Sequence, residues 1–248
     1  MKNIGLALGG GGVLGAAHIG ALRAMEEQEI EIEYISGTSI GAFVAVFYAF
    51  GNKSDKIEEI VSELKWLDIS RVSLSRYGLL SIERLGDLIT EHLGNRNIED
   101  AQIPLTIVAT DIYTGEKVVF DKGSVADAVM ASMSIPGIFQ PLEINGKMLV
   151  DGGIAENVPV NTVKKMGAGY VIGIDLNAKH NYEKPANIID VIMNSLHFLI
   201  KVSDQLQTKD SDLLIKPDLS KFNRSDIEQV NQLMSKGYED TKKVLNQI

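Results

Sequence analysis

Large apolar residues recur along the chain with two spacings, one typical of strands and one of helices. Residues 3–8 alternate large apolar with small side chains, as in a strand that is covered on both faces. Residues 16–27 repeat Ile19, Leu22 and Met25 on one side, which predicts a helix. The same signals predict further strands at 34–36, 104–109, 117–120, 142–144, 147–150, 170–174 and 212–215, and further helices at 40–50, 188–206 and from about 54, 81 and 225. This alternation predicts an α/β fold, a three-layer α/β/α sandwich with a mostly parallel central sheet.

Two of the predicted helices are unusually apolar. Ile40–Phe50 is apolar all round, but it is shorter than the roughly 20 residues needed to cross a bilayer, so we expect it to be buried. The helix at 188–206 places Ile192, Leu199 and Leu206 on one side, together with Ile189 and Leu196. We expect that side to pack on the core or on another copy rather than to anchor the chain in a membrane. No repeat or linker divides residues 1–248, which predicts a single domain.

Composition excludes several classes of function. The 248 residues include 24 basic and 33 acidic ones, a net charge of -9, and no basic run that would bind nucleic acid. The absence of cysteine excludes disulfides, a thiolate nucleophile and zinc sites with sulfur ligands. No spacing of metal ligands is present, and we expect neither a metal nor a cofactor. The start of the chain lacks the apolar core of a signal peptide, which predicts a cytoplasmic protein.

A glycine-rich turn separates the first predicted strand from the first predicted helix. The segment Gly10-Gly11-Gly12-Val13-Leu14-Gly15 fits G-x-G-x-x-G, in which backbone N–H groups converge at a helix N-terminus. That geometry suits either a dinucleotide pyrophosphate or the oxyanion of an acyl-transfer intermediate. A nucleotide-binding domain would carry an acidic residue at the end of the second strand, where Ser36 and Gly37 stand, so we disfavour it.

A second glycine-framed turn follows the second predicted strand. Gly37-Thr38-Ser39-Ile40-Gly41 fits G-x-S-x-G, in which glycines relieve crowding around a serine held in a strained strand-to-helix turn. The simpler interpretation is that Thr38 or Ser39 only caps the helix. Because the following helix is so apolar, we expect it at the middle of the sheet, where open α/β folds bind their ligands.

A third site, Asp151-Gly152-Gly153, ends a predicted hairpin strand. Glycines behind a carboxylate allow another backbone or a substrate to approach closely, although an aspartate at a turn commonly just accepts backbone hydrogen bonds. Asp111 and Asp175 also follow strands, but neither precedes a pair of glycines.

The four histidines do not complete a catalytic triad. His18 precedes the serine, His92 ends a surface helix, His180 lies in a polar loop, and His197 is most simply a packing residue on the long helix. A Ser-Asp dyad fits the sequence better. An ordinary aspartate is a poor proton acceptor from serine, so burial would have to raise the pKa of Asp151 toward neutrality.

The three motifs, in this order, resemble the patatin-like phospholipase family over nearly the whole chain. The segments that carry the resemblance are Gly10–Gly15, Gly37–Gly41, Val108–Asp111, Ala131–Gly137, Asp151–Val160 and Ile215–Leu219. The resemblance implies a patatin-like fold and a lipid acyl hydrolase of the phospholipase A or lysophospholipase type. In that family pattern Ser39 is the nucleophile, Asp151 is the general base, and the N–H groups of Gly10, Gly11, Gly12 and Ile40 bind the oxyanion. Gly15, Gly37, Gly41, Gly152 and Gly153 then shape the turns.

One departure leaves an alternative open. Where family members often carry arginine or lysine, this chain has Leu14. A non-catalytic lipid-binding or regulatory protein of the same fold therefore remains an alternative. The expected partner is a lipid or fatty-acyl ester, and any membrane contact is expected to be transient and apolar because the chain is acidic. Residues 66–82 form either a lid next to the site or a loop whose apolar residues pack on the core.

Overall fold

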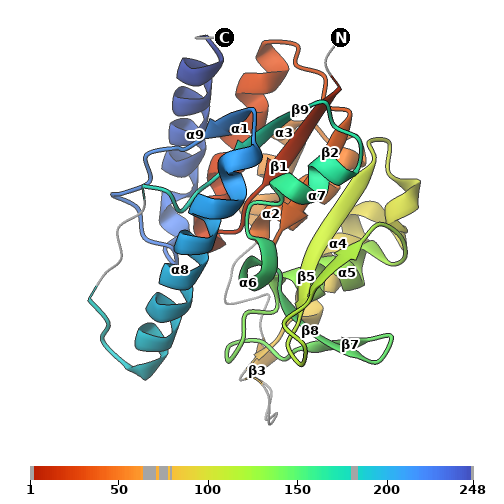
Figure 1. Cartoon of the computed structure of the whole chain (residues 1–248), viewed down its shortest axis with the longest axis vertical. Helices are drawn as coiled ribbons and strands as arrows, with labels where there is room; N and C mark the ends of the chain where they lie inside the picture. The colour runs from red at the N-terminus through yellow and green to blue at the C-terminus, as the bar shows by residue number, and fades with distance from the viewer. Residues whose placement is uncertain (1–2, 64–70, 73–77, 79, 180–183, 247–248) are drawn as a thin grey trace.

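A computed structural model describes residues 3–63, 71–72, 78, 80–179 and 184–246. Its main sheet has eight strands in the order β10-β9-β1-β2-β5-β8-β7, with β6 paired to β5 (Figure 1). The strands from β10 to β5 are parallel to their neighbours, whereas β6, β8 and β7 pair antiparallel at one edge. The strands are β1 Ile4–Leu8, β2 Tyr34–Thr38, β5 Leu105–Asp111, β6 Lys117–Phe120, β7 Leu142–Ile144, β8 Lys147–Asp151, β9 Tyr170–Ile174 and β10 Leu213–Ile215, with a separate pair, β3 Arg71–Val72 and β4 Leu80–Ser81.

Helices cover both faces of the sheet, so the predicted three-layer α/β/α arrangement is confirmed. In Figure 1, α6, α7 and α8 lie in front of the sheet, and α1, α2, α4 and α5 lie behind it. The α-helices are α1 Ala16–Glu27, α2 Ile40–Ala49, α3 Ser54–Glu63, α4 Glu83–Leu93, α5 Val125–Met133, α6 Gly153–Glu156, α7 Val160–Lys165, α8 Ile188–Gln207 and α9 Val230–Leu245. Short 3-10 turns lie at Gly12–Gly15, Ile98–Asp100, Thr208–Asp210 and Ile227–Gln229. None of the described helices is both long and apolar enough to span a bilayer.

The predicted elements occur close to their expected positions, and the exceptions are short helices. The hairpin between β7 and β8 turns at Asn145 and Gly146, both with positive φ (53° and 75°), as a type I′ turn requires. Helices α5, α6 and α7 were not predicted. The last two have four and six residues, too few for a helical period to stand out in the sequence.

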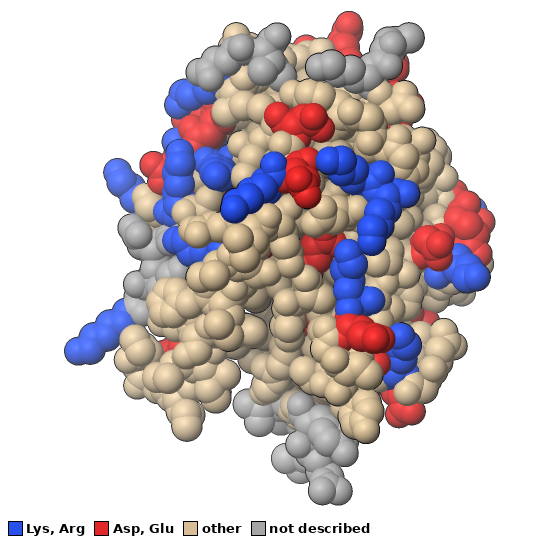
Figure 2. Space-filling view, in the orientation of Figure 1, with Lys and Arg blue, Asp and Glu red and all other residues tan. Residues whose placement is uncertain are grey.

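Of the two expectations for the apolar side of α8, packing on the core is wrong, and contact with another copy stays a prediction. Within α8, all of whose residues are described, Asp204 is the one buried side chain. Large apolar side chains such as Leu199 (70% exposed) face outward along the helix. In Figure 2 the surface at the lower left, where this helix lies, is mostly tan, so few charged residues cover it. Residues 66–82, which were expected to form either a lid or a loop packed on the core, lie largely outside the described residues, but Leu80, in β4, packs partly buried against the core.

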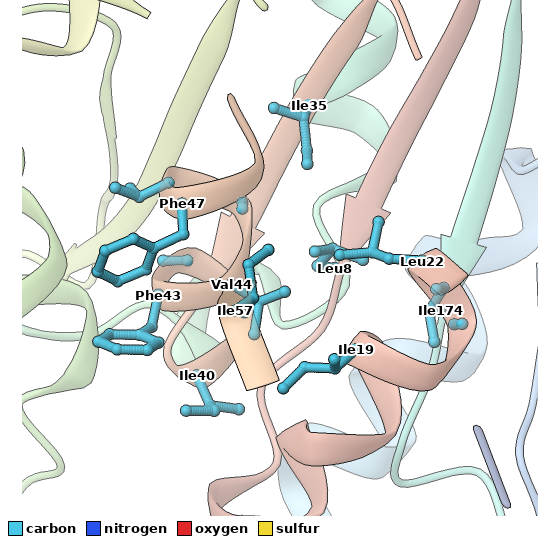
Figure 3. Packing of buried hydrophobic residues seen from close by; sticks show 14 of the residues in the cluster. Leu8, Ile19, Leu22, Ile35, Ile40, Phe43, Val44, Phe47, Ile57 and Ile174 are labelled. Carbon is cyan, nitrogen blue, oxygen red and sulfur yellow. The ribbon is translucent and has the colours of Figure 1, made fainter. Parts of the chain in front are cut away.

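The core is built around α2, the helix that follows the predicted serine turn. Nine of its ten residues are buried, and none is charged. Phe43 and Phe47 meet edge to face with ring centroids 4.9 Å apart, and Figure 3 shows Val44 beside Ile57 of α3 (Figure 3). The strand that precedes α2 is β2, which lies between β1 and β5. The expectation that this helix lies at the middle of the sheet is therefore confirmed. The N-terminus of α2 is thereby held at the carboxyl end of the central strands.

Candidate active site

Ser39 occupies a strained turn between β2 and α2. Its backbone has φ 55° and ψ -129°, a conformation that non-glycine residues adopt at a cost of about 1–3 kcal/mol. The glycines on either side make this turn possible, because a Cβ on Gly37 would lie 2.4 Å from the carbonyl oxygen of Gly41. A Cβ on Gly41 would lie 2.2 Å from the carbonyl oxygen of Leu8. The predicted relief of crowding by these glycines is therefore present.

The hydroxyl group of Ser39 does not cap the helix. No side-chain hydrogen bond caps the N-terminus of α2, and Thr38 donates its hydroxyl instead to the carbonyl oxygen of Glu156, at 2.9 Å. The Ser39 side chain lies close enough to Asp151 to lower the pKa of its carboxyl group. Its backbone N–H donates to Ser132 Oγ (2.8 Å), which in turn donates to the carbonyl oxygen of Val108 (2.6 Å). Ser132 thus links the serine turn to β5 through these two hydrogen bonds. Sequence reasoning did not assign this role.

Asp151 ends β8 directly opposite the serine turn. Its Oδ1 accepts a hydrogen bond from the N–H of Gly153 at 2.7 Å. A Cβ on Gly152 would lie 2.1 Å from the carbonyl oxygen of Val108, so a glycine is needed for the strands to approach. Burial raises the pKa of Asp151 to about 6, against the opposing effects of the hydrogen bonds from Ser39 and Gly153. The carboxylate is consequently a better proton acceptor than an exposed aspartate.

The two rival aspartates have other local partners. Asp111 accepts a hydrogen bond from the N–H of Tyr113, and Asp175 accepts from the N–H groups of Asn177 and Ala178. Both arrangements are backbone-capping turns. Of the three aspartates that follow strands, Asp151 is the one whose carboxylate meets the serine hydroxyl.

The glycine-rich turn lies beside Ser39 and is held by asparagines. The N–H of Gly10 donates to Asn157 Oδ1 at 3.1 Å, and Asn177 Nδ2 donates to the carbonyl oxygen of Gly10 at 3.2 Å. The N–H of Gly10 is therefore engaged, which is at odds with the expectation that it binds an oxyanion. Within the described part of the chain, the N–H groups of Gly11, Gly12 and Ile40 have no hydrogen-bond partner.

A buried network ties this turn to α8. Asn157 Nδ2 donates to Asp204 Oδ2 at 2.8 Å. Burial and, second, the nearby charge of Asp175 together raise the pKa of Asp204 to about 7, against the opposing effect of the hydrogen bond from Asn157. Sequence reasoning assigned no role to either residue. Asn157 lies in the segment Asp151–Val160 that carries the family resemblance, whereas Asp204 lies in none of these segments.

The histidines are placed differently from one another. His18 is fully buried in α1, where its Nε2–H donates to the carbonyl oxygen of Gly9 at 2.7 Å, and burial lowers its pKa to about 4. Its neutral ring supports the glycine-rich turn from behind. His92 packs edge to face on Phe47, and His180 lies outside the described residues. His197 was interpreted as a packing residue, but it lines the same cavity as Ser39 and Asp151.

The cavity at Ser39 is small and opens into a larger groove. A volume of about 40 Å³ is enclosed by the glycine-rich turn, Ser39, Asp151 and the inner side of α8. The adjoining groove has a volume of about 470 Å³ and shares five lining residues with it, Gly12, Ile135, Met193, His197 and Arg224. A long substrate would therefore reach the serine by way of this groove.

The cation missing at position 14 has a counterpart elsewhere in the chain. Leu14 is fully buried, so its side chain belongs to the core. Arg224 lines both the cavity and the groove, and its guanidinium donates to Asn177 Oδ1. A positive charge therefore lies beside the glycine-rich turn even though the motif lacks one. Among the described residues no cluster of three or more His, Asp or Glu side chains is arranged to hold a metal ion.

Comparison with known proteins gives a consistent result. The sequence pattern of one family, described as patatin-like phospholipase, matches residues 6–164. An uncharacterized NTE family protein of Mycobacterium tuberculosis is 37% identical over 177 residues, which cover 70% of this chain and 49% of that protein. Lysophospholipase NTE1 of Coccidioides immitis is 33% identical over 186 residues, covering 71% of this chain and 12% of the relative. The chain thus spans about half the length of the first relative and much less of the second.

Solved structures share the fold at low sequence identity. VipD from Legionella pneumophila superimposes with a TM-score of 0.69 at 14% identity, covering 100% of this chain and 67% of VipD. ExoU from Pseudomonas aeruginosa superimposes with a TM-score of 0.54 at 15% identity, covering 99% of this chain and 52% of ExoU. These similarities bear on the fold alone.

Proposed function

Because the chain belongs to the patatin-like phospholipase family, we propose that it hydrolyses carboxyl esters of lipids, as a phospholipase A or lysophospholipase, through a Ser39–Asp151 dyad. The observation that carries the proposal is that Ser39 and Asp151 line one cavity, where burial raises the pKa of the carboxylate to about 6 against the opposing effect of the serine hydroxyl. The names of the NTE relatives, among them lysophospholipases, support the same reaction class.

In the first step Ser39 Oγ attacks the carbonyl carbon of the ester while its proton passes to Asp151. The negative charge that develops on the carbonyl oxygen needs donors that are already in place. We assign this role to the N–H groups of Gly11, Gly12 and Ile40, since that of Gly10 donates to Asn157. Gly10 then contributes to the position of the turn rather than to the charge.

Collapse of the tetrahedral intermediate breaks the ester C–O bond, and the leaving alcohol takes the proton from Asp151. Asp151 then accepts a proton from water as that water attacks the acyl-enzyme. The fatty acid leaves, and the proton returns to Ser39. The dyad needs no histidine, because the raised pKa of Asp151 brings its proton affinity closer to what the reaction requires.

A nucleotide-binding domain and a non-catalytic lipid-binding protein, the two alternative functions, would use the glycine-rich turn, Ser39 and Asp151 differently. A nucleotide-binding turn would have to accept a pyrophosphate beside the carboxylate of Asp151, which repels it, and with the N–H of Gly10 already engaged. A non-catalytic lipid-binding protein would need no hydrogen bond between Ser39 and Asp151 and would lack a reactive hydroxyl.

Covalent labelling with a fluorophosphonate probe tests the nucleophile. We expect the wild-type chain to be labelled and Ser39→Ala to be unlabelled, with Ser235→Ala, at an exposed serine of α9, as a serine control that still reacts. Hydrolysis of a short-chain p-nitrophenyl ester should follow the same order. Undiminished labelling of Ser39→Ala, or an unreactive wild type, would refute the assignment, and the latter would favour the non-catalytic alternative.

A further inference from the structure

We infer that the outer face of α8 is a docking surface for a lipid bilayer, which it contacts from one side without crossing it. The inference rests on the proposed function, because it supplies the way in which a lipid reaches the groove beside Ser39. The region lies beyond residues 6–164, which the family pattern matches.

The outer face of α8 is a mainly apolar stripe, interrupted by the exposed Ser195. Eight of the twelve large apolar side chains that are exposed in the described part of the chain belong to this one helix. Ile188 (75% exposed), Leu199 (70%) and Leu206 (63%) fall within about 20° of one another at 3.6 residues per turn. The remaining members are Ile189, Val191, Ile192, Phe198 and Val202.

Charge is confined to the opposite side of the helix. The three charged residues of α8 are Asp190, Lys201 and Asp204, and the helical repeat places all three away from the stripe. Asp190 caps the helix start by accepting from the N–H of Ala186, and Asp204 is buried. In Figure 2 the lower part of α8 presents a mostly uncharged surface. Such a stripe can enter an apolar medium without burying a charge.

The stripe and the candidate active site share the helix. The inner face of α8 lines the cavity at Ser39 with Met193, Leu196, His197 and Ile200. Ile189 borders the adjoining groove, together with Lys184 and Arg224. If the stripe rests on a bilayer, the groove therefore opens at the level of the lipids, and an acyl chain can slide along α8 toward the serine. This continuity is the main argument for a lipid surface as the occupant.

The size of the stripe argues against a second copy of the chain. A helix of 20 residues is about 30 Å long, and a strip about 10 Å wide along it covers on the order of 300 Å². A stable dimer buries roughly 800 Å² on each partner. A helix lying in a membrane interface needs no such area, since it gains from each apolar side chain that leaves water. The net charge of -9 favours a bilayer without net negative charge.

Flotation with large unilamellar vesicles of phosphatidylcholine tests the inference. All proteins carry Ser39→Ala, so that the vesicles stay intact. We expect binding of this protein and an at least tenfold weaker binding after Ile192→Gln, Leu199→Gln and Val202→Gln are combined. The matched control removes three exposed apolar side chains elsewhere, and its binding should stay within twofold.

The control combines Ile112→Gln, Tyr113→Gln and Val119→Gln, all outside α8 and exposed by 45%, 92% and 39%. Equal binding of the α8 variant and the control would overturn the inference. The inference would also be overturned if the chain with an intact stripe formed a dimer, and the α8 variant lost that dimer but kept its vesicle binding. Flotation does not use turnover, so failure of the esterase assay would refute the proposed function and leave this result standing.

A second measurement does not depend on a triple substitution. The chain has no cysteine, so Leu199→Cys and Val119→Cys can each carry a single environment-sensitive fluorophore. On addition of the vesicles, emission from position 199 should shift to the blue and emission from position 119 should not. An unchanged spectrum at position 199 would overturn the inference even if the triple variant failed to fold.

Discussion

Helices α2 and α8 have similar apolar sequences but opposite surroundings. Nine of the ten residues of α2 are buried, whereas Asp204 alone is buried among the twenty residues of α8, all of them described. In α2 the apolar side chains pack on the sheet, and the helix N-terminus presents Ser39. In α8 they face outward, and the inner side closes the cavity over Ser39. One helix holds the proposed chemistry, and the other controls what reaches it.

The comparison shows why apolar content alone does not predict burial. A helix with apolar residues all round, such as α2, has to be covered on every side. A helix with a single stripe, such as α8, can direct that stripe inward or outward, and the periodicity is the same in both cases. The deciding contact is Asp204, whose hydrogen bond with Asn157 fixes the polar side of α8 toward the body of the protein.

The largest expected effect separates the catalytic role of Asp151, which serves the serine turn before α2, from the lining role of α8. Asp151→Asn should lower kcat for a short-chain ester by about 10²- to 10⁴-fold, because the variant side chain cannot accept the serine proton. His197→Ala, on α8, should lower it less than tenfold, since the dyad needs no histidine. Steady-state kinetics with both variants measures the difference.

Asp111→Asn provides the matched control, because that aspartate also follows a strand and accepts a backbone hydrogen bond. Its turnover should stay within twofold of wild type. A loss in His197→Ala as large as that in Asp151→Asn would replace the proposed dyad with a triad that recruits its histidine from α8.

The next prediction concerns stability. Phe43→Ala in α2 removes a fully buried ring and should lower the free energy of unfolding by about 3–5 kcal/mol. Leu199→Ala in α8 removes a side chain that is 70% exposed, and its effect should stay within about 0.5 kcal/mol. Urea denaturation of the two variants measures both values. A cost above 2 kcal/mol for Leu199→Ala would mean that the stripe is covered in solution.

The sequence predicted the parts of the site that carry backbone signals. Glycines at 37 and 41 and the hairpin before Asp151 are visible because only certain residues fit those conformations. Ser132, Asn157 and Asp204 were given no role, although Ser132 and Asn157 each lie one hydrogen bond from a predicted residue and Asp204 lies one further bond away. Their positions follow from the packing of segments that are distant in the sequence, and no local pattern encodes that packing. Arg224 is a similar case, since it approaches the glycine-rich turn from far along the chain.

The pH dependence of catalysis has a smaller expected effect. The base has to be deprotonated, and burial raises the pKa of Asp151 to about 6. Below that value kcat/KM should fall by about tenfold per pH unit, so the rate at pH 4.5 should be roughly thirtyfold below the plateau. An exposed aspartate would titrate near pH 4 instead. A profile that is flat from pH 8 down to 4.5 would show that no base with a pKa near 6 acts in catalysis, and so that the pKa of Asp151 is not raised in the active enzyme.

The smallest expected effect concerns the one buried side chain of the fully described α8. The pKa of Asp204 is raised to about 7 in the folded chain and lies near 3.9 in an unfolded one. The folded state therefore binds the proton more tightly. The stability that this supplies is complete below pH 3.9 and is lost as the pH rises through about 7.

Asp204→Asn removes this titration while keeping a polar group that can hydrogen-bond to Asn157. Between pH 6 and 8 the wild-type chain should lose about 1 kcal/mol of stability relative to the variant. Denaturation of both proteins at the two pH values measures the difference, and the titration of His18, common to both, cancels. A constant difference would show that the pKa of Asp204 in the folded chain lies below this range, so that the raised value near 7 is wrong. The polar side of α8 would then be held by a charge, which would sharpen its contrast with the uncharged α2.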